Sequence, residues 1–209
     1  MNAIVVQPFP SPAGELLLGD FDGQVVLCDW TVERRRGAND RRVQRTLGTA
    51  CETGDSPLLR RLRKELFEYF AGRRCAFNLP VRYTGTPFEA RVWDELRRIP
   101  YGETISYGEL ARRIGNPAAT RAVAGANARN PVSILVPCHR VIAAAGGLGG
   151  YGGGLAAKRF LLDLERNPAR RKVVMSLSKR SEHDDAIAVC GDGVIVSEKG
   201  KPFGTGLGE

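Results

Sequence analysis

The chain has 209 residues, of which 43% are hydrophobic and 26% charged, and this balance indicates a folded globular protein rather than a disordered one. No apolar run approaches the roughly 20 residues that a membrane-spanning helix needs, and the first residues lack the layout of a secretory signal, so we expect a cytoplasmic protein with no membrane contact. The five cysteines form no C-x-x-C pair and only two histidines occur, so we predict no disulfide framework, no metal site and no cofactor.

The first thirty residues have the pattern of strands. Residues 14–21 and 24–30 are rich in aliphatic side chains and flank Asp22-Gly23, a dipeptide typical of two-residue hairpin turns. Residues 33–55 are polar and contain several glycines, which predicts a long loop or a poorly ordered segment.

A helix is predicted to begin at Ser56, with Pro57 in its first position, and to end at Ala71-Gly72. Its leucines and phenylalanines repeat at helical spacing and give it one apolar face. A short extended linker over 77–81 follows. We therefore expect a small N-terminal domain of sheet and helix over residues 1–82.

Sharper helix signals follow from Thr86 onward. Thr86-Pro87-Phe88-Glu89 and Ser106-Tyr107-Gly108-Glu109 both have the form of a capping box, and Gly115 ends the second helix. Asn116 then caps a further helix, rich in small residues, from Pro117 to about Ala128. Two helices joined by so tight a turn are either a DNA-binding helix-turn-helix or a plain αα-hairpin of a helical core.

The remainder completes the predicted order of a winged helix. Residues 134–137 are predicted to be a buried strand or extended run, the glycine-rich stretch 146–154 a hairpin or wing, and residues 155–165 a last helix whose Leu155 points inward. The fold class is thus α/β (α+β), with a winged helix-turn-helix domain over 86–167. We expect residues 168–209 to be an extension, disordered or a short hairpin, with no chemistry of its own.

A long stretch without carboxylates lies inside the second domain. No Asp or Glu occurs between Glu109 and Asp163, and the net charge of the whole chain is +8. This pattern fits a surface that faces phosphates and equally fits a solvated basic face. The basic residues of this stretch are Arg112, Arg113, Arg121, Arg129, Arg140, Lys158 and Arg159.

Pro137-Cys138-His139-Arg140 holds the candidate chemistry. A free thiol has a pKa near 8.5, so a nucleophilic cysteine needs a base or a positive field. His139 is adjacent, but neighbouring side chains on an extended segment point to opposite faces, so a water or a turn must join it to Cys138. Glu165 is the candidate acid that orients the histidine. Taken alone, Cys138 is more often a buried core cysteine than a nucleophile.

The motifs together closely resemble the O6-alkylguanine-DNA alkyltransferases. The resemblance is strong from Phe88 to Glu165 and weak over 1–85, and it does not reach the tail. It is carried by Ile99 to Gly102, Ser106 to Gly108, Arg121 to Val123, Asn130-Pro131, Ile134 to Val141 and Gly150-Tyr151.

The resemblance implies a DNA repair protein that moves an alkyl group irreversibly from O6 of guanine, and from O4 of thymine, to its own Cys138. His139, Glu165, Asn130 and Tyr107 would support Cys138 in catalysis. The DNA-binding residues would be Arg121, which fills the gap left by the flipped base, with Tyr107, Ala122, Ala128 and Arg129. The pocket would be walled by Val141, Tyr151, Gly152 and Gly153.

The implied partner is double-stranded DNA that contains O6-alkylguanine, bound by a monomer. Arg113, Arg129 and Lys158 would add phosphate contacts. The zinc site of some relatives is not expected, and Ala124 departs from a glycine common in the family. Two other functions stay open: a winged-helix protein that binds alkyl lesions without catalysis, and a cysteine hydrolase that uses Cys138 and His139.

Overall fold

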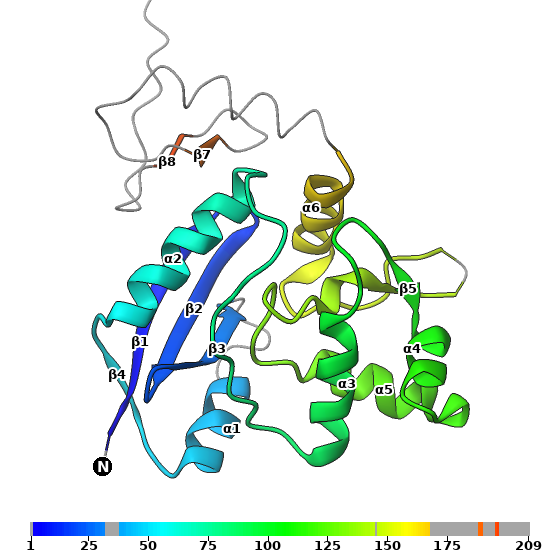
Figure 1. Ribbon diagram of the computed structural model, residues 1–209, viewed down its shortest axis with the longest axis horizontal. Coiled ribbons are helices and arrows are strands. Elements are labelled where there is room, and N and C mark those ends of the chain that lie inside the picture. The colour runs from blue at the N-terminus through cyan, green and yellow to red at the C-terminus, as the bar shows by residue number, and fades with distance from the viewer. Residues whose placement is uncertain (1, 32–37, 145, 168–187, 190–194, 197–209) are drawn as a thin grey trace, which may run out of the picture.

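The computed structural model describes residues 2–31, 38–144, 146–167, 188–189 and 195–196. Figure 1 shows a sheet crossed by a long helix on one side of the molecule and a group of helices on the other. Most of the predicted extension 168–209 lies outside the described residues. Within it, β7 (Ala188–Val189) and β8 (Ile195–Val196) pair antiparallel, as the predicted hairpin requires.

A four-stranded sheet forms the N-terminal half. Its strands are β1 (Ile4–Ser11), β2 (Gly14–Phe21), β3 (Gln24–Trp30) and β4 (Cys51–Thr53), in the order β3-β2-β1-β4. The turn between β2 and β3 has φ of 52° at Asp22 and 73° at Gly23, as a type I′ turn requires. The hairpin predicted from Asp22-Gly23 is confirmed.

The prediction of a loop over 33–55 is wrong for the part that the structure describes. Helix α1 (Ala38–Leu47) and strand β4 lie in this segment. Only Val43 of the helix is buried, so the apolar periodicity by which a helix is recognised is missing. Tertiary contacts hold α1 instead, since Asn39 donates a hydrogen bond to Asp29 and Arg42 forms an ion pair with Glu89.

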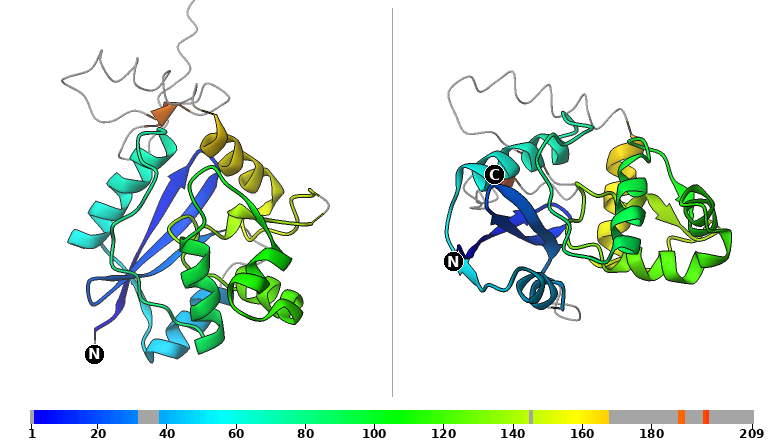
Figure 2. Two further views of the ribbon diagram at one scale, coloured as in Figure 1. Left: turned by 45° about the vertical axis from the view of Figure 1, so that its right-hand side comes forward. Right: turned by 60° about the horizontal axis from the view of Figure 1, so that its bottom comes forward.

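Helix α2 (Pro57–Phe70) begins as predicted, with the Ser56 hydroxyl accepting a hydrogen bond from the Leu59 amide. Leu59, Leu62 and Leu66 pack onto one face of the sheet, against side chains that include Leu16 and Leu18. Val43 of α1 packs against Ile4, Val6 and Val26 on the opposite face. The sheet therefore lies between the two helices, as the right-hand view of Figure 2 shows.

The C-terminal half is mainly helical. Its elements are α3 (Pro87–Arg97), β5 (Ile105–Ser106), α4 (Tyr107–Arg113), a 3-10 turn (Pro117–Ala119), α5 (Thr120–Ala128), β6 (Val141–Ile142) and α6 (Gly154–Arg166). The capping box at Thr86 is confirmed in both directions. At Ser106 the hydroxyl accepts from the Glu109 amide, and Gly115 ends the helix region with a φ of 76°.

Three details of this half differ from the prediction. Asn116 precedes the 3-10 turn but makes no capping hydrogen bond through its side chain. The described residues of the glycine-rich stretch 146–154 contain no strand, and β6 instead pairs in parallel with β5. Leu155 is 51% exposed rather than inward; it lies in the first turn of α6, whose buried residues begin at Ala157.

One hydrophobic core joins the two halves, with members from β2, α2, α3, α5 and α6. The outer edge of β3 is also hydrogen-bonded to the second half of the chain. The Cys28 amide donates to the Pro131 carbonyl at 2.8 Å, and the Ser133 amide donates to the Cys28 carbonyl at 2.7 Å. None of the helices in the described part of the chain has the length and apolar character needed to cross a bilayer.

Candidate active site

Cys138 lies on a single 3-10 turn (Cys138–Arg140), and residues 134–135 before it form a turn, so the prediction of a buried strand or extended run over 134–137 is wrong. The chain reverses sharply before Cys138, with the Ser133 and Val136 backbones bridged and Ile134 at a φ of 73°, which is rare for a β-branched residue. Asn130 holds this reversal: its amide donates to the Val136 carbonyl at 2.8 Å and its oxygen accepts from the Val132 amide at 3.0 Å.

The thiol of Cys138 lies at a cavity of about 560 Å³ between the sheet and the helical half. Cys138 itself is only 4% exposed. The cavity can therefore admit a flat group the size of a nucleobase while keeping the sulfur away from bulk water. Its lining residues are Asp29, Trp30, Ala38, Asn39, Tyr107, Ala124, Gly125, Asn127, Ala128, Arg129, Asn130, Ser133, Cys138, Gly150, Tyr151 and Gly152.

Behind the cysteine, a buried carboxylate orders the neighbouring side chains. Glu165 Oε1 lies 2.9 Å from His139 Nε2, and Arg140 donates to both oxygens of Glu165, at 2.8 and 2.9 Å. The Tyr69 hydroxyl and the Gly102 amide donate to the same carboxylate, at 2.7 and 3.0 Å. With so many donors around one carboxylate, its ionised form is strongly favoured.

The pKa values in this group follow from burial and from these bonds. Burial would raise the pKa of Glu165, but the hydrogen bonds and charges of His139 and Arg140 lower it well below its usual range. Burial lowers the pKa of His139, against the pull of Glu165, so the imidazole is neutral at pH 7. Burial also raises the pKa of Cys138 to about 11, so the resting residue is a thiol.

The tautomer of His139 follows from its partner. An ionised Glu165 only accepts hydrogen bonds, so the neutral imidazole must carry its proton on Nε2. Nδ1 is then an acceptor, and it is buried without a hydrogen-bond partner among the described residues. The histidine, which follows Cys138 in the chain, therefore has the protonation state of a general base, with Nδ1 unprotonated.

Two tyrosines, Tyr107 and Tyr151, line the cavity together with Cys138. Tyr107 begins α4, and burial together with the nearby Cys138 raises the pKa of its hydroxyl. The Tyr151 hydroxyl accepts a hydrogen bond from Trp30 Nε1 at 3.1 Å, which ties the glycine-rich loop to the sheet. Gly153 allows this contact, because a Cβ there would lie 2.6 Å from the Trp30 ring.

Helix α5 presents an exposed side beside the cavity mouth. Arg121, Ala122, Ala128 and Arg129 are all exposed, and Ala128 and Arg129 also line the cavity. The Arg129 side chain is 52% exposed and forms an ion pair with the largely buried Glu89, so part of its charge is already partnered. Arg121 lies in the first turn of the helix and is exposed.

Some predicted residues lie elsewhere. Val141 is fully buried beneath the site, and neither it nor Gly153 is among the lining residues. The carboxylate-free stretch is not one basic surface, since Arg140 is buried on Glu165 and Lys158 is buried on carbonyl oxygens. The Lys158 ammonium donates to the carbonyls of Val141, at 2.6 Å, and of Leu148, so it is not placed to bind phosphate.

Sequence reasoning also missed several lining residues. Asp29 on β3 and Asn39 on α1 come from the N-terminal half, and nothing in their local sequence marks them as part of a site. Ser133 and Asn127 lie between motif residues but carry no signal of their own. Among the described residues, no cluster of three or more His, Cys, Asp or Glu side chains could hold a metal ion.

Comparison with known proteins places this geometry in a family. Residues 87–167 match the family model described as "6-O-methylguanine DNA methyltransferase, DNA binding domain". A methylated-DNA–protein-cysteine methyltransferase of Haemophilus influenzae is 40% identical over 169 residues, which cover 80% of this chain and 89% of the relative. Another, of Methanosarcina acetivorans, is 43% identical over 158 residues, or 75% of this chain and 95% of the relative.

Solved structures agree with the sequence relatives. The O6-methylguanine methyltransferase of Mycobacterium tuberculosis is 39% identical, with a TM-score of 0.67 over 79% of this chain and 96% of its own. A structure described as Mycobacterium tuberculosis OGT in complex with DNA is 38% identical, with a TM-score of 0.68 over 83% of this chain and 98% of its own. With 40% identity over nearly the whole length of a curated relative, the chain belongs to the methylated-DNA–protein-cysteine methyltransferase family.

Proposed function

We propose that the protein repairs DNA by transferring an alkyl group from O6 of guanine to the sulfur of Cys138, once per molecule. The observation that carries the proposal is the buried thiol at a nucleobase-sized cavity, next to a neutral histidine whose Nε2 faces an ionised glutamate. Family membership and the relatives' names support the same reaction.

The first step is removal of the thiol proton. At a pKa of about 11, Cys138 is almost wholly protonated at pH 7, and the thiolate is the nucleophile. His139 Nδ1 accepts the proton, directly or through one water, and Glu165 stabilises the imidazolium that forms. Asn130 holds the sharp turn before Cys138, and hydrogen bonding by its side chain lowers the pKa of the thiol, which favours the thiolate.

The thiolate then attacks the alkyl carbon. The S–C bond forms as the C–O6 bond breaks, and guanine leaves with the electron pair of that bond. Tyr107 lines the cavity with its hydroxyl protonated, so it can supply a proton to the departing base. The product is a thioether, which is stable to hydrolysis, and so the sulfur is not regenerated.

The base must leave the duplex to reach this sulfur. Flipping a nucleotide costs a few kcal/mol, and a side chain that fills the vacated stack offsets part of that cost. We assign this role to Arg121, which is exposed at the start of α5. Ala122, Ala128 and Arg129 lie on the exposed part of the same helix, and their small or cationic side chains suit close contact with a phosphate backbone.

Other features of the protein stay proposals. We keep the division into residues 1–82, 86–167 and 168–209, although one core joins the first two parts. Cys28, Cys51 and Cys138 form no disulfide with another described residue, which supports a reducing compartment such as the cytoplasm. Transfer by a monomer fits a site built from one chain.

The test is the intact mass of the protein after incubation with a duplex that contains O6-methylguanine. We expect a gain of one CH₂ group per molecule, mapped to the peptide that contains Cys138, and no further repair when more substrate is added. Cys138→Ser should bind the duplex without gaining mass. Repeated turnover would favour a cysteine hydrolase, and binding without any transfer by the intact protein would favour a non-catalytic lesion binder.

A further inference from the structure

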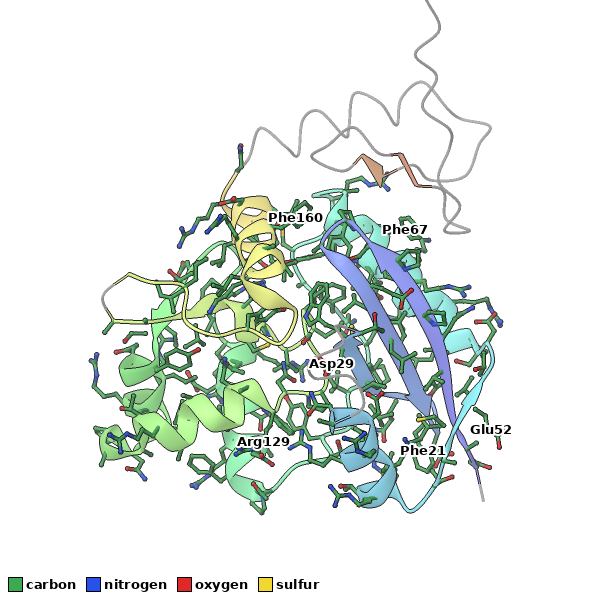
Figure 3. The ribbon with its side chains drawn as sticks, turned by 180° about the vertical axis from the view of Figure 1, so that it is seen from behind. Phe21, Asp29, Glu52, Phe67, Arg129 and Phe160 are labelled. Carbon is green, nitrogen blue, oxygen red and sulfur yellow. The ribbon has the colours of Figure 1, made fainter. Side chains whose placement is uncertain are left out.

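A second group of polar side chains leads from the N-terminal sheet toward Cys138. It starts at Asp29, which follows Cys28 on β3, and Cys28 is hydrogen-bonded through its backbone to both Pro131 and Ser133. This pairing places the Asp29 carboxylate beside the loop that carries the cysteine. Figure 3 labels Asp29 at the junction between the sheet and the helical half.

Hydrogen bonds connect the members of this group. The Asn39 amide donates to Asp29 Oδ2 at 2.6 Å, and the Ser133 hydroxyl is 3.4 Å from Asp29 Oδ1. Ser133 is 3% exposed, and hydrogen bonding by its hydroxyl lowers the pKa of Cys138, whereas the charge of Asp29 raises it. Asp29, Ser133 and Cys138 all line the same cavity, so the carboxylate, the hydroxyl bound to it and the reactive sulfur share one site.

A hydroxyl has only one proton to donate, and this fixes what the serine can do. When Asp29 is ionised, Ser133 donates to the carboxylate and turns a lone pair toward the sulfur, where it can accept a bond from the thiol but not donate one to a thiolate. The negative charge of Asp29 also opposes a second negative charge on the sulfur. When Asp29 is neutral, Ser133 is free to donate to the thiolate.

We propose that Asp29, acting through Ser133, is a positioning residue that keeps Cys138 in its protonated, less reactive form while the site is at rest. The inference rests on the proposed function, in which Cys138 is the acceptor and is used once. A thiol resists oxidation and stray alkylation better than a thiolate, so this arrangement protects the single sulfur that the reaction consumes. Asp29 thus acts against His139, which removes the thiol proton of Cys138 in the proposed reaction.

The surroundings of Asp29 agree with this role. Burial raises the pKa of Asp29 to about 6, although Asn39, the Trp30 backbone and Ser133 lower it by hydrogen bonding. The group is therefore mainly ionised at pH 7 and loses its charge as the pH falls through about 6. The charged and titratable groups that face it are Asp40 and Arg42 from α1, Cys28 from β3, Cys138 from the active-site turn and Tyr151 from the glycine-rich loop.

The test is the pH profile of Cys138 modification by iodoacetamide, read by peptide mass spectrometry without DNA. Asp29→Asn keeps the shape and the bond to Asn39 but removes the charge. We expect it to lower the midpoint for Cys138 by about one pH unit, or about tenfold more modification at a given pH. The exposed Cys75 of the same molecule is an internal reference, and Asp163→Asn, on the exposed side of α6, is the matched charge control.

Two further variants test the route. In a Ser133→Ala background, the shift caused by Asp29→Asn should fall to less than half, because only the direct charge effect remains. Asn39→Ala removes a hydrogen bond that lowers the pKa of Asp29, so it should increase Cys138 modification at pH 7 in the same direction as Asp29→Asn.

The outcomes separate this inference from the proposed function. An unchanged or raised midpoint in Asp29→Asn, with normal methyl transfer by the wild-type protein, overturns the inference alone. An equal shift with and without Ser133 overturns the serine route. Failure of the wild-type protein to take a methyl group from DNA overturns the proposed function, whatever the iodoacetamide profile shows.

Discussion

Glu165 is the side chain on which the active site depends most. Its carboxylate is buried, and it accepts hydrogen bonds from Tyr69, Gly102, Arg140 and His139. Arg140 in turn donates to the Ile99 carbonyl at 2.7 Å and lies over the Tyr101 ring. The Glu165 carboxylate, which sets the histidine tautomer, therefore also connects α6 to the end of α3 through Arg140.

Replacing this carboxylate by an amide should harm stability as well as catalysis. Glu165→Gln leaves the buried Arg140 guanidinium without its counter-charge, and breaking a buried pair in this way typically costs about 3 to 5 kcal/mol. Urea unfolding of both proteins measures the loss. Glu109→Gln, whose partners Arg112 and Arg113 are much more exposed, is the control and should change the unfolding midpoint far less.

The free energy of unfolding should fall less steeply with decreasing pH in Glu165→Gln than in the wild-type protein. The folded pKa of Glu165 lies below its unfolded value, so its contribution is full above about pH 4.3 and is lost as the pH falls toward the folded value. His139, kept neutral by burial, takes up a proton on unfolding below about pH 6.5, which acts in the same direction. An equally steep acid loss in Glu165→Gln would contradict the assignment to Glu165.

At the scale of the element, α5 should matter for duplex substrates and not for the chemistry itself. Arg121 is exposed and is not among the residues that line the cavity, so Arg121→Ala should leave the sulfur unchanged. We expect repair of O6-methylguanine in a duplex to slow by about tenfold or more, because the flipped nucleotide loses the side chain that fills its place. Reaction with free O6-benzylguanine should stay within about twofold. Single-turnover rates on the two substrates measure the difference.

Lys64→Ala on α2 is a matched control, since it removes one exposed cationic side chain from a helix on the other half of the molecule. It should slow neither reaction. If Arg121→Ala slows both substrates equally, Arg121 supports the pocket rather than the flipped state.

The glycine-rich loop is the second element for which we make a prediction, because position 153 requires a glycine. Gly153 packs against the Trp30 ring, which is buried, and a Cβ at Gly153 would lie 2.6 Å from its ring atoms. Gly153→Ala should therefore destabilise the protein by about 1 to 3 kcal/mol and displace Tyr151 from its bond to Trp30. Gly150→Ala, where a Cβ meets no described atom within 4 Å, should have little effect on the thermal midpoint.

At the scale of the whole molecule, the shared core predicts one cooperative unfolding transition. Trp30 lies in the sheet and Trp93 on α3, both in the same hydrophobic cluster, and they are the two tryptophans of the chain. Trp30→Phe and Trp93→Phe each leave one reporter. In each variant, urea unfolding followed by fluorescence should coincide with unfolding followed by circular dichroism. Two separated midpoints would mean that the halves fold independently.

The local signals of the sequence were enough for the elements that carry strong ones. The Asp22-Gly23 turn, the Ser56-Pro57 start of α2 and the Thr86 capping box are all in place, because each depends on hydrogen bonds and backbone angles within a few residues. The polar helix α1 was missed for the opposite reason. Asn39 and Arg42 hold it through partners distant in the chain, and no periodic pattern records those contacts.

The sequence alone determined the identity of the chemistry, since the Pro-Cys-His-Arg motif and its neighbours mark the family without any coordinates. Only the tertiary structure decided which basic residues are available and which groups control the thiol. Arg140 and Lys158 are buried on oxygen acceptors, and Asp29 meets Ser133 because β3 pairs with the active-site loop across 104 positions of the chain. Burial and long-range pairing set the charge and the pKa of a side chain, and neither is a property of the residues next to it in sequence.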